Sequence, residues 1–134
     1  MAGVSWGAKG PGLGKVGGPS VDLPVGETAP GSGCCGCGGF DAALAPEIAD
    51  VVLAGLETHV CVTQTALDLL ARGVGVFVAV DAIASRHAID HEVALRRLEG
   101  AGAVLTTTEA VLFEWCRTAE HPQFQAIRRL VTSA

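Results

Sequence analysis

Residues 51–70, VVLAGLETHVCVTQTALDLL, determine the fold predicted for this chain. The stretch opens with an apolar run that stops at Gly55, and an amphipathic helical pattern begins at about Cys61. We interpret it as a strand, a loop and a helix, with Cys61 in the first turn of the helix. The unpaired N–H groups and the dipole at that end of a helix favour the thiolate, which is the nucleophilic form of cysteine. The alternative interpretation of Cys61 is a small core residue, because free cysteines are often buried.

Length and composition narrow the class of protein. With 134 residues, of which 49% are hydrophobic, the chain has the size of one globular domain. Its net charge of −5 argues against nucleic acid as a partner, because phosphate binding requires a basic surface. No apolar run approaches the roughly 18 residues of a membrane span, and residues 1–18 do not resemble a signal segment. We therefore expect a soluble, cytoplasmic protein without a membrane partner, whose five cysteines are reduced thiols.

The composition changes sharply near residue 40. Of the 18 glycines, 13 precede Phe40, and glycine at that density costs much backbone entropy in an ordered element. We expect no regular element over residues 1–33. The predicted organisation is a Gly/Pro-rich, irregular or disordered segment over residues 1–39, followed by an α/β domain over residues 40–134.

From residue 40 onward, helical and strand patterns alternate. Strands are predicted over residues 51–54, 74–80 and 103–105, and helices over residues 40–48, 61–72, 89–99, 106–116 and 124–131. This alternation is typical of an α/β fold with a parallel sheet, in which ligands bind at the carboxyl edge of the strands. The loop over residues 55–61, Asp81 and residues 106–108 should therefore converge at that edge.

Other motifs in the sequence can be explained without a functional site. Residues 12–17 match G-x-G-x-x-G, but no strand pattern precedes them, so we expect no dinucleotide cofactor. The cysteines of Cys34-Cys35-Gly36-Cys37 have no second spaced pair to complete a zinc site, and loop thiols are the simpler interpretation. His59 is a candidate base for Cys61, although adjacent loop residues rarely reach each other. Asp81, Ser85 and Arg86 end the second strand, where they could contact a ligand or cap a turn.

Three segments carry a resemblance to a known family: GLETHVCVTQTALDLLARG (55–73), VAVDAIASR (78–86) and GAVLTTTEAVLFEW (102–115). Together they resemble the isochorismatase-like cysteine hydrolases, which include nicotinamidase, and most closely the isochorismatase-domain-containing branch. The resemblance covers about residues 51–132 and is faint over residues 34–44. It implies a three-layer, Rossmann-like α/β fold with a parallel sheet flanked by helices.

The resemblance also implies a site. In that family the cysteine attacks an amide carbonyl, and water resolves the covalent intermediate. Carried over to this sequence, Cys61 is the nucleophile and the Leu56–Glu57 peptide bond is cis. The backbone N–H groups of Glu57 and Cys61 are then the oxyanion donors, and each such donor can lower the barrier by about 3–4 kcal/mol. No cofactor and no metal are implied.

Two residues of the family pattern are not found upstream. The family activates its cysteine with an Asp at the end of its first strand and a Lys on a later one. No apolar strand ending in Asp precedes residue 51, and residues 28–32, TAPGS, stand near where the branch carries its Lys. The chain therefore resembles the C-terminal half of such a hydrolase, an N-terminally truncated version of the fold.

Two functions follow from this comparison. The first is a hydrolase that acts on a small amide or related carbonyl compound through Cys61. The second is a catalytically silent fragment or pseudoenzyme that lacks the Asp and the Lys, and at most serves as an oligomerisation or interaction module. An unpaired edge strand next to residues 51–54 would promote association, so a homo-oligomer is expected.

Overall fold

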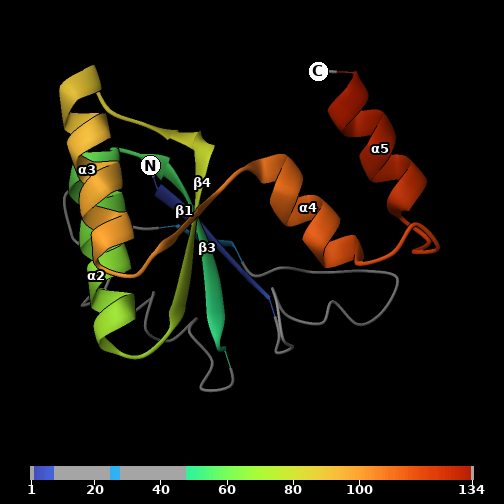
Figure 1. Cartoon of the computed structure of the whole chain (residues 1–134), viewed down its shortest axis with the longest axis horizontal. Helices are drawn as coiled ribbons and strands as arrows, with labels where there is room; N and C mark the ends of the chain where they lie inside the picture. The colour runs from blue at the N-terminus through green and yellow to red at the C-terminus, as the bar shows by residue number, and fades with distance from the viewer. Residues whose placement is uncertain (1, 8–24, 28–47, 134) are drawn as a thin grey trace.

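The computed structural model describes residues 2–7, 25–27 and 48–133, and their strands form one five-stranded sheet (Figure 1). The order across the sheet is β2-β1-β3-β4-β5. The strands are β1 (Ala2–Gly7), β2 (Val25–Glu27), β3 (Asp50–Leu56), β4 (Gly75–Ala84) and β5 (Val104–Thr106). The helical segments are the π-helical turn η1 (Thr58–Val62) and the α-helices α2 (Thr63–Ala71), α3 (Ala88–Gly100), α4 (Thr108–Cys116) and α5 (Phe124–Thr132).

Strands β3, β4 and β5 form the parallel part of the sheet. Each is followed by helix, and α2 and α3 lie side by side on one face while α4 and α5 lie on the opposite side (Figure 1). The predicted α/β fold, a parallel sheet flanked by helices, is therefore confirmed for this part of the chain. Strands β3 and β4 both extend further at their carboxyl ends than their apolar runs indicated.

The N-terminal strands correct one prediction. We expected no regular element over residues 1–33, but β1 pairs antiparallel with both β2 and β3, which makes the complete sheet mixed. The edge of β3 that was expected to be open is covered by β1, from Ala2 opposite Gly55 to Gly7 opposite Asp50. Backbone hydrogen bonds, which every residue type can form, explain how a glycine-rich segment without an apolar pattern pairs here. The expected helix over residues 40–48 lies almost entirely outside the described residues, and the division at residues 39 and 40 stays a prediction.

The larger core lies between the sheet and the α2/α3 pair. Alternate residues of the strands point to this face, and the buried stripes of both helices meet them. Leu53 of β3, Leu69 of α2 and Leu98 of α3 are almost fully buried. The buried members are Val51, Leu53, Val62, Ala66, Leu69, Val76, Val78, Ile83, Leu98 and Ala103.

A smaller core lies on the opposite face, under α4. Its buried members are Val52, Ala79 and Val111, with Phe77, Ala82 and Trp115 partly buried around them. Helix α5 packs on α4 through the rings of Phe113 and Phe124, whose centroids are 5.6 Å apart. None of the α5 residues is buried.

The positions at which the helices begin and end agree with the sequence pattern to within one or two residues. Gly73 follows α2 with φ of +79°, a conformation that favours glycine, and the N–H of Val74 donates to the carbonyl of Leu69 at 3.1 Å. The spacing of Thr106 and Glu109 in the sequence predicts a capping box, but the cap lies one position later, where the side chain of Thr107 accepts from the N–H of Ala110. Helical periodicity predicts that Val93 faces inward on α3, but Val93 is 49% exposed.

No helix within the described part of the chain is long and apolar enough to cross a membrane.

Candidate active site

The loop that carries Cys61 leaves the carboxyl end of β3. Gly55 has φ of +122°, which only glycine adopts without strain, and the peptide bond between Leu56 and Glu57 is cis, at the position that the resemblance indicates. The chain then forms η1 and continues directly into α2. The prediction that Cys61 lies in the first turn of an α-helix is therefore wrong in detail. It lies in a π-helical turn before the α-helix, a geometry that is frequent at functional sites.

Hydrogen bonds within the turn fix the backbone around Cys61. The carbonyl of Glu57 accepts from the N–H groups of Val60 at 3.1 Å and Val62 at 3.2 Å. The hydroxyl of Thr65 donates to the carbonyl of Cys61 at 2.7 Å. Cys61 is partly exposed, whereas Cys116 at the end of α4 is buried and has its Sγ 3.8 Å from His121 Nδ1. A thiol that solvent can reach and a backbone held from both sides suit a reactive position.

Glu57 lies between the cis peptide and the turn, and its side chain pairs with the β4–α3 connection. Arg86 Nε donates to Glu57 Oε1 at 2.8 Å. Partial burial opposes ionisation of the carboxyl, but the hydrogen bonds and the charge of Arg86, with the charge of His59, outweigh it and hold the pKa of Glu57 below its usual value. The carboxylate is therefore ionised at neutral pH.

The His59 side chain contacts the end of the β4–α3 connection and the first turn of α3. Its Nδ1 is hydrogen-bonded to Ser85 Oγ at 3.0 Å and lies 3.6 Å from Glu57 Oε2, while its Nε2 lies 3.9 Å from Asp90 Oδ2. No hydrogen bond joins His59 to Cys61 within the described residues, so the interpretation of His59 as the base for this thiol receives no support.

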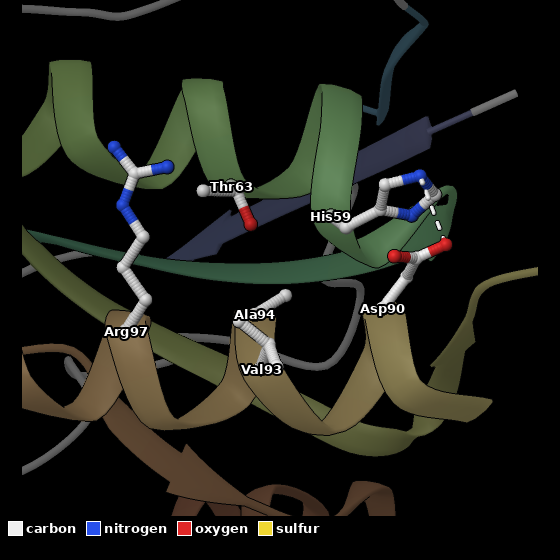
Figure 2. Close-up of a pocket in the computed structure, with 6 residues that line it drawn as sticks. All are labelled: His59, Thr63, Asp90, Val93, Ala94 and Arg97. Atoms are coloured by element: carbon white, nitrogen blue, oxygen red, sulfur yellow. Dashed lines mark ion pairs between the residues drawn. The ribbon is translucent and has the colours of Figure 1, made fainter. Parts of the chain in front are cut away.

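A cavity of about 170 Å³ opens beside His59, between η1 and α2 on one side and α3 on the other (Figure 2). In Figure 2, Thr63 and Ala94 lie at its middle, with His59 and Asp90 at one end and Arg97 at the other. Its walls therefore combine small apolar groups with charges of both signs. Cys61 does not line this cavity. The lining residues are His59, Thr63, Asp90, Val93, Ala94 and Arg97.

Asp81 caps a helix. Its carboxylate accepts from the N–H of Thr108 at 2.8 Å and from the hydroxyl of Thr108 at 2.5 Å, at the start of α4. The hydrogen bonds from Thr108 outweigh the effect of burial and lower the pKa of Asp81. The sequence indicated a cap or turn residue for the helix start that follows Asp81, but the structure shows Asp81 at the start of α4, beyond α3 and β5 in the chain. Between the pairs Leu53–Val78 and Gly55–Ile83, β3 advances by two positions and β4 by five, so Asp81 lies within the irregularity and outside the ladder with β3.

The expected convergence at the strand ends is observed as two sets of contacts. Residues 57–59 contact residues 85–91 above the α2/α3 face, and Asp81 contacts Thr108 on the α4 side. Sequence reasoning missed Asp90 and His91, which meet the loop from the first turn of α3. Thr58 Oγ1 is hydrogen-bonded to His91 Nδ1 at 3.0 Å. A helix that starts just after β4 places its first turn beside the loop that follows the neighbouring strand β3. The position of the helix start in the sequence could therefore have indicated Asp90 and His91.

Several candidates from the sequence cannot be placed. The glycine motif of residues 12–17 and the cysteines at 34, 35 and 37 lie outside the described residues. Within the described part, no group of three or more His, Cys, Asp or Glu side chains is arranged to hold a metal ion.

Comparison with known proteins identifies the family. The isochorismatase domain matches residues 34–110, more than half of the chain, and the chain belongs to this family. The isochorismatase domain-containing protein 2 of Bos taurus is 50% identical over 86 residues, which are 64% of this chain and 42% of that protein. The chain thus spans less than half the length of this relative.

Solved structures show the same fold. The MAR1 ribonuclease from Caenorhabditis elegans is 43% identical, with a TM-score of 0.62 over 64% of this chain and 45% of that one. The YcaC gene product of Escherichia coli, an octameric hydrolase of unknown specificity, is 30% identical, with a TM-score of 0.59 over 71% of this chain and 52% of that one. The predicted family resemblance is confirmed.

Proposed function

We propose that this protein is a hydrolase of a small amide or related carbonyl compound, with Cys61 as its nucleophile. The observation that carries the proposal is the loop itself. Cys61 is a partly exposed residue within the isochorismatase domain, in the loop that leaves the carboxyl end of a parallel strand, where α/β proteins bind ligands.

The proposed reaction has two steps. The Cys61 thiolate attacks the carbonyl carbon, the C–N bond breaks, and the amine leaves with a proton, which gives an S-acyl enzyme. Water then attacks the thioester, releases the carboxylic acid and regenerates the thiol. The N–H groups of Glu57 and Cys61 stabilise the oxyanion in both steps, and donors of this kind lower a barrier most when they are fixed before the reaction.

The test pairs a substrate panel with site-resolved labelling of the thiol. The purified chain and Cys61→Ala are incubated with small primary amides, and released ammonia is measured. We expect turnover that falls by a factor on the order of a thousand or more in Cys61→Ala, since removing a nucleophile eliminates the covalent route. Cys116→Ala is the matched control and should keep its activity. Turnover that persists in Cys61→Ala would refute the proposal.

The panel includes single-stranded RNA, because one similar structure is a ribonuclease from Caenorhabditis elegans. We expect no cleavage of RNA by this chain, because its net charge of −5 disfavours a phosphate backbone. If the chain cleaves RNA and Cys61→Ala does not, Cys61 remains the proposed nucleophile, but the proposed substrate class changes from small amides to RNA.

The second candidate is a catalytically silent member of the family. One observation favours it: within the described residues, no carboxylate, amine or imidazole forms a hydrogen bond with Cys61 Sγ. The rate of iodoacetamide labelling against pH separates the two candidates. Labelling of Cys61 that saturates below pH 7 supports an activated nucleophile. A midpoint near the ordinary cysteine pKa of about 8.5, together with no turnover, supports the silent form.

We also propose that the protein is cytoplasmic and forms a homo-oligomer. The YcaC gene product is octameric, and this chain carries exposed apolar side chains on its helices, including Ile89 at 61% and Leu130 at 64% exposure. Light scattering coupled to size-exclusion chromatography measures the assembly, and a monomer across the micromolar range would refute this part.

A further inference from the structure

The loop that carries Cys61 is attached to one neighbouring segment by side chains of consecutive residues. Glu57 pairs with Arg86, Thr58 with His91 and His59 with Ser85, at 2.8, 3.0 and 3.0 Å. All three contacts run from residues 57–59 to residues 85–91, the connection between β4 and α3 and the first turn of that helix. Together we name them the loop clamp. Cys61 follows its last member by two residues.

The three contacts differ in their surroundings, and the difference indicates which one controls the loop. Thr58 is fully buried, so its hydroxyl requires a partner for the chain to fold, and His91 supplies it. The Glu57 side chain is 25% exposed, and its partner Arg86 is 74% exposed. The Glu57–Arg86 pair can therefore be removed without leaving a hole in the core.

The chemistry of this pair suits a positioning role. The Nε–H of Arg86 makes a charge-assisted hydrogen bond, which is shorter and stronger than a neutral one. The other carboxylate oxygen, Glu57 Oε2, is buried without a hydrogen bond and lies 3.6 Å from His59 Nδ1. The carboxylate thus depends on Arg86 for its direct hydrogen bond. The backbone N–H of Glu57 is also a proposed oxyanion donor. A contact that fixes the Glu57 side chain therefore helps to fix the position of this N–H.

We propose that Arg86, through Glu57, is a positioning residue that holds the loop of residues 56–62 in the conformation required for the reaction at Cys61. Arg86 touches neither Cys61 nor the proposed oxyanion donors. This inference rests on the proposed function, because it concerns how that function's nucleophile is held.

The test is a double-mutant cycle in the full chain, with Arg86→Gln, Glu57→Gln and both together. Site-resolved iodoacetamide labelling reports the loop and does not require a substrate. Cleavage after Leu56 and Leu69 by chymotrypsin separates Cys61 from the other cysteines. Cys116 is buried at the end of α4 and reports global opening in the same sample. Arg96→Gln, an exposed α3 residue, controls for the loss of one positive charge.

We expect Arg86→Gln to raise the labelling rate of Cys61 by about three- to tenfold, as expected for loss of one charge-assisted contact. The labelling rate of Cys116 stays unchanged. Glu57→Gln has at least the same effect, because it removes the charge that both the side chain and the backbone N–H of Arg86 contact. The double variant adds nothing to Glu57→Gln, because the side-chain contact of Arg86 is already weakened in that variant. Arg86→Lys, which keeps the charge, restores part of the wild-type rate. Where an amide is hydrolysed, kcat falls while KM changes little, since a positioning residue acts on the loop and not on the substrate; a change in KM alone would instead assign Arg86 to substrate binding.

Three results of the labelling would also overturn the inference: a Cys61 labelling rate equal to that of the wild type, effects of the two substitutions that add, or parallel increases at Cys61 and Cys116. The last would assign Arg86 to general stability. Absence of turnover in the wild-type chain would refute the proposed function and leave the labelling cycle valid. The two failures are therefore distinguishable.

Discussion

The two faces of the sheet differ in the cores that the described residues form on them. On the α2/α3 face, ten buried residues of the described part form one continuous core, and the loop of Cys61 is attached to that layer. On the α4 face, the core of described residues has three buried members, and α5 contributes none. Both crossover helices lie on the first face, because β3, β4 and β5 follow one another across the sheet in chain order. The candidate site is therefore built on the better packed side.

This difference between the faces matters for the candidate site, which requires a backbone held in one conformation. A nucleophile and its oxyanion donors require a fixed backbone, and the α2/α3 layer fixes η1 through buried side chains such as Val62 and Thr58. Besides its small core, the start of α4 is bonded to the end of the sheet by the exposed carboxylate of Asp81. We expect substitutions on the first face to affect both stability and the site, and those on the second to affect stability alone.

The largest expected effect is that of Leu98→Ala. Leu98 is fully buried where α3 meets the sheet, so the change creates a cavity and costs about 3–4 kcal/mol of the free energy of unfolding. Urea denaturation measures this loss. Leu130→Ala is the matched control, because Leu130 of α5 is 64% exposed, and it should cost no more than about 0.5 kcal/mol. Equal losses at the two positions would contradict the description of the α2/α3 core.

A sharper comparison uses two consecutive residues of β3. Val51 is fully buried in the α2/α3 core and Val52 is 7% exposed in the smaller one. The same change to Ala removes the same atoms on opposite faces. We expect Val51→Ala to cost about 2–3 kcal/mol and Val52→Ala about 1–1.5 kcal/mol, since a looser site relaxes more readily around the two lost methyl groups. Denaturation midpoints of both variants test this, and a larger loss at Val52 would reverse the ranking of the faces.

The fold and the position of the site could be predicted from the sequence to different depths. The Val, Leu and Ala patterns around Gly55 and Gly73 specify a parallel strand–helix–strand unit, because burial on both faces of a strand produces a continuous apolar run. Strand β1 could not be predicted, since its pairing depends on backbone groups and leaves no side-chain pattern. Val93 was misassigned because helical periodicity gives the direction of a face but not its width.

The contacts of the loop required coordinates. Glu57, His59 and Arg86 are polar residues at or between the ends of regular elements, and a sequence does not say which of several polar partners lies within hydrogen-bond distance. The motif around Cys61 indicated where the loop is, and the structure added the segment that holds it. The roles of Cys61 and Glu57 in a reaction stay predictions until the nucleophile test is made.

The charge that caps α4 gives a pH-dependent difference between the faces. The pKa of Asp81 is lowered in the folded chain from its ordinary value of 3.8, so its contribution to stability is fully present above that value and is lost as the pH falls through the lower, folded pKa. At pH 7 we expect Asp81→Asn to cost about 0.5–1 kcal/mol, the usual range for an exposed helix cap. Below about pH 4 the difference from the wild type should close. A difference that is constant from pH 7 to pH 3 would show that the charge of Asp81 does not matter.

The smallest effect on folding is expected at the exposed face of α5. A substitution there can still have a large effect on the assembly of protomers. Leu130→Asp should change the free energy of unfolding of the protomer by less than about 0.5 kcal/mol, because no core is disturbed. Gln125→Asp, also exposed on α5, is the matched control for charge. Light scattering of both variants at equal concentration then assigns the helix a role. Dissociation by Leu130→Asp alone places α5 in the proposed oligomer interface. An unchanged mass for both variants removes α5 from that interface.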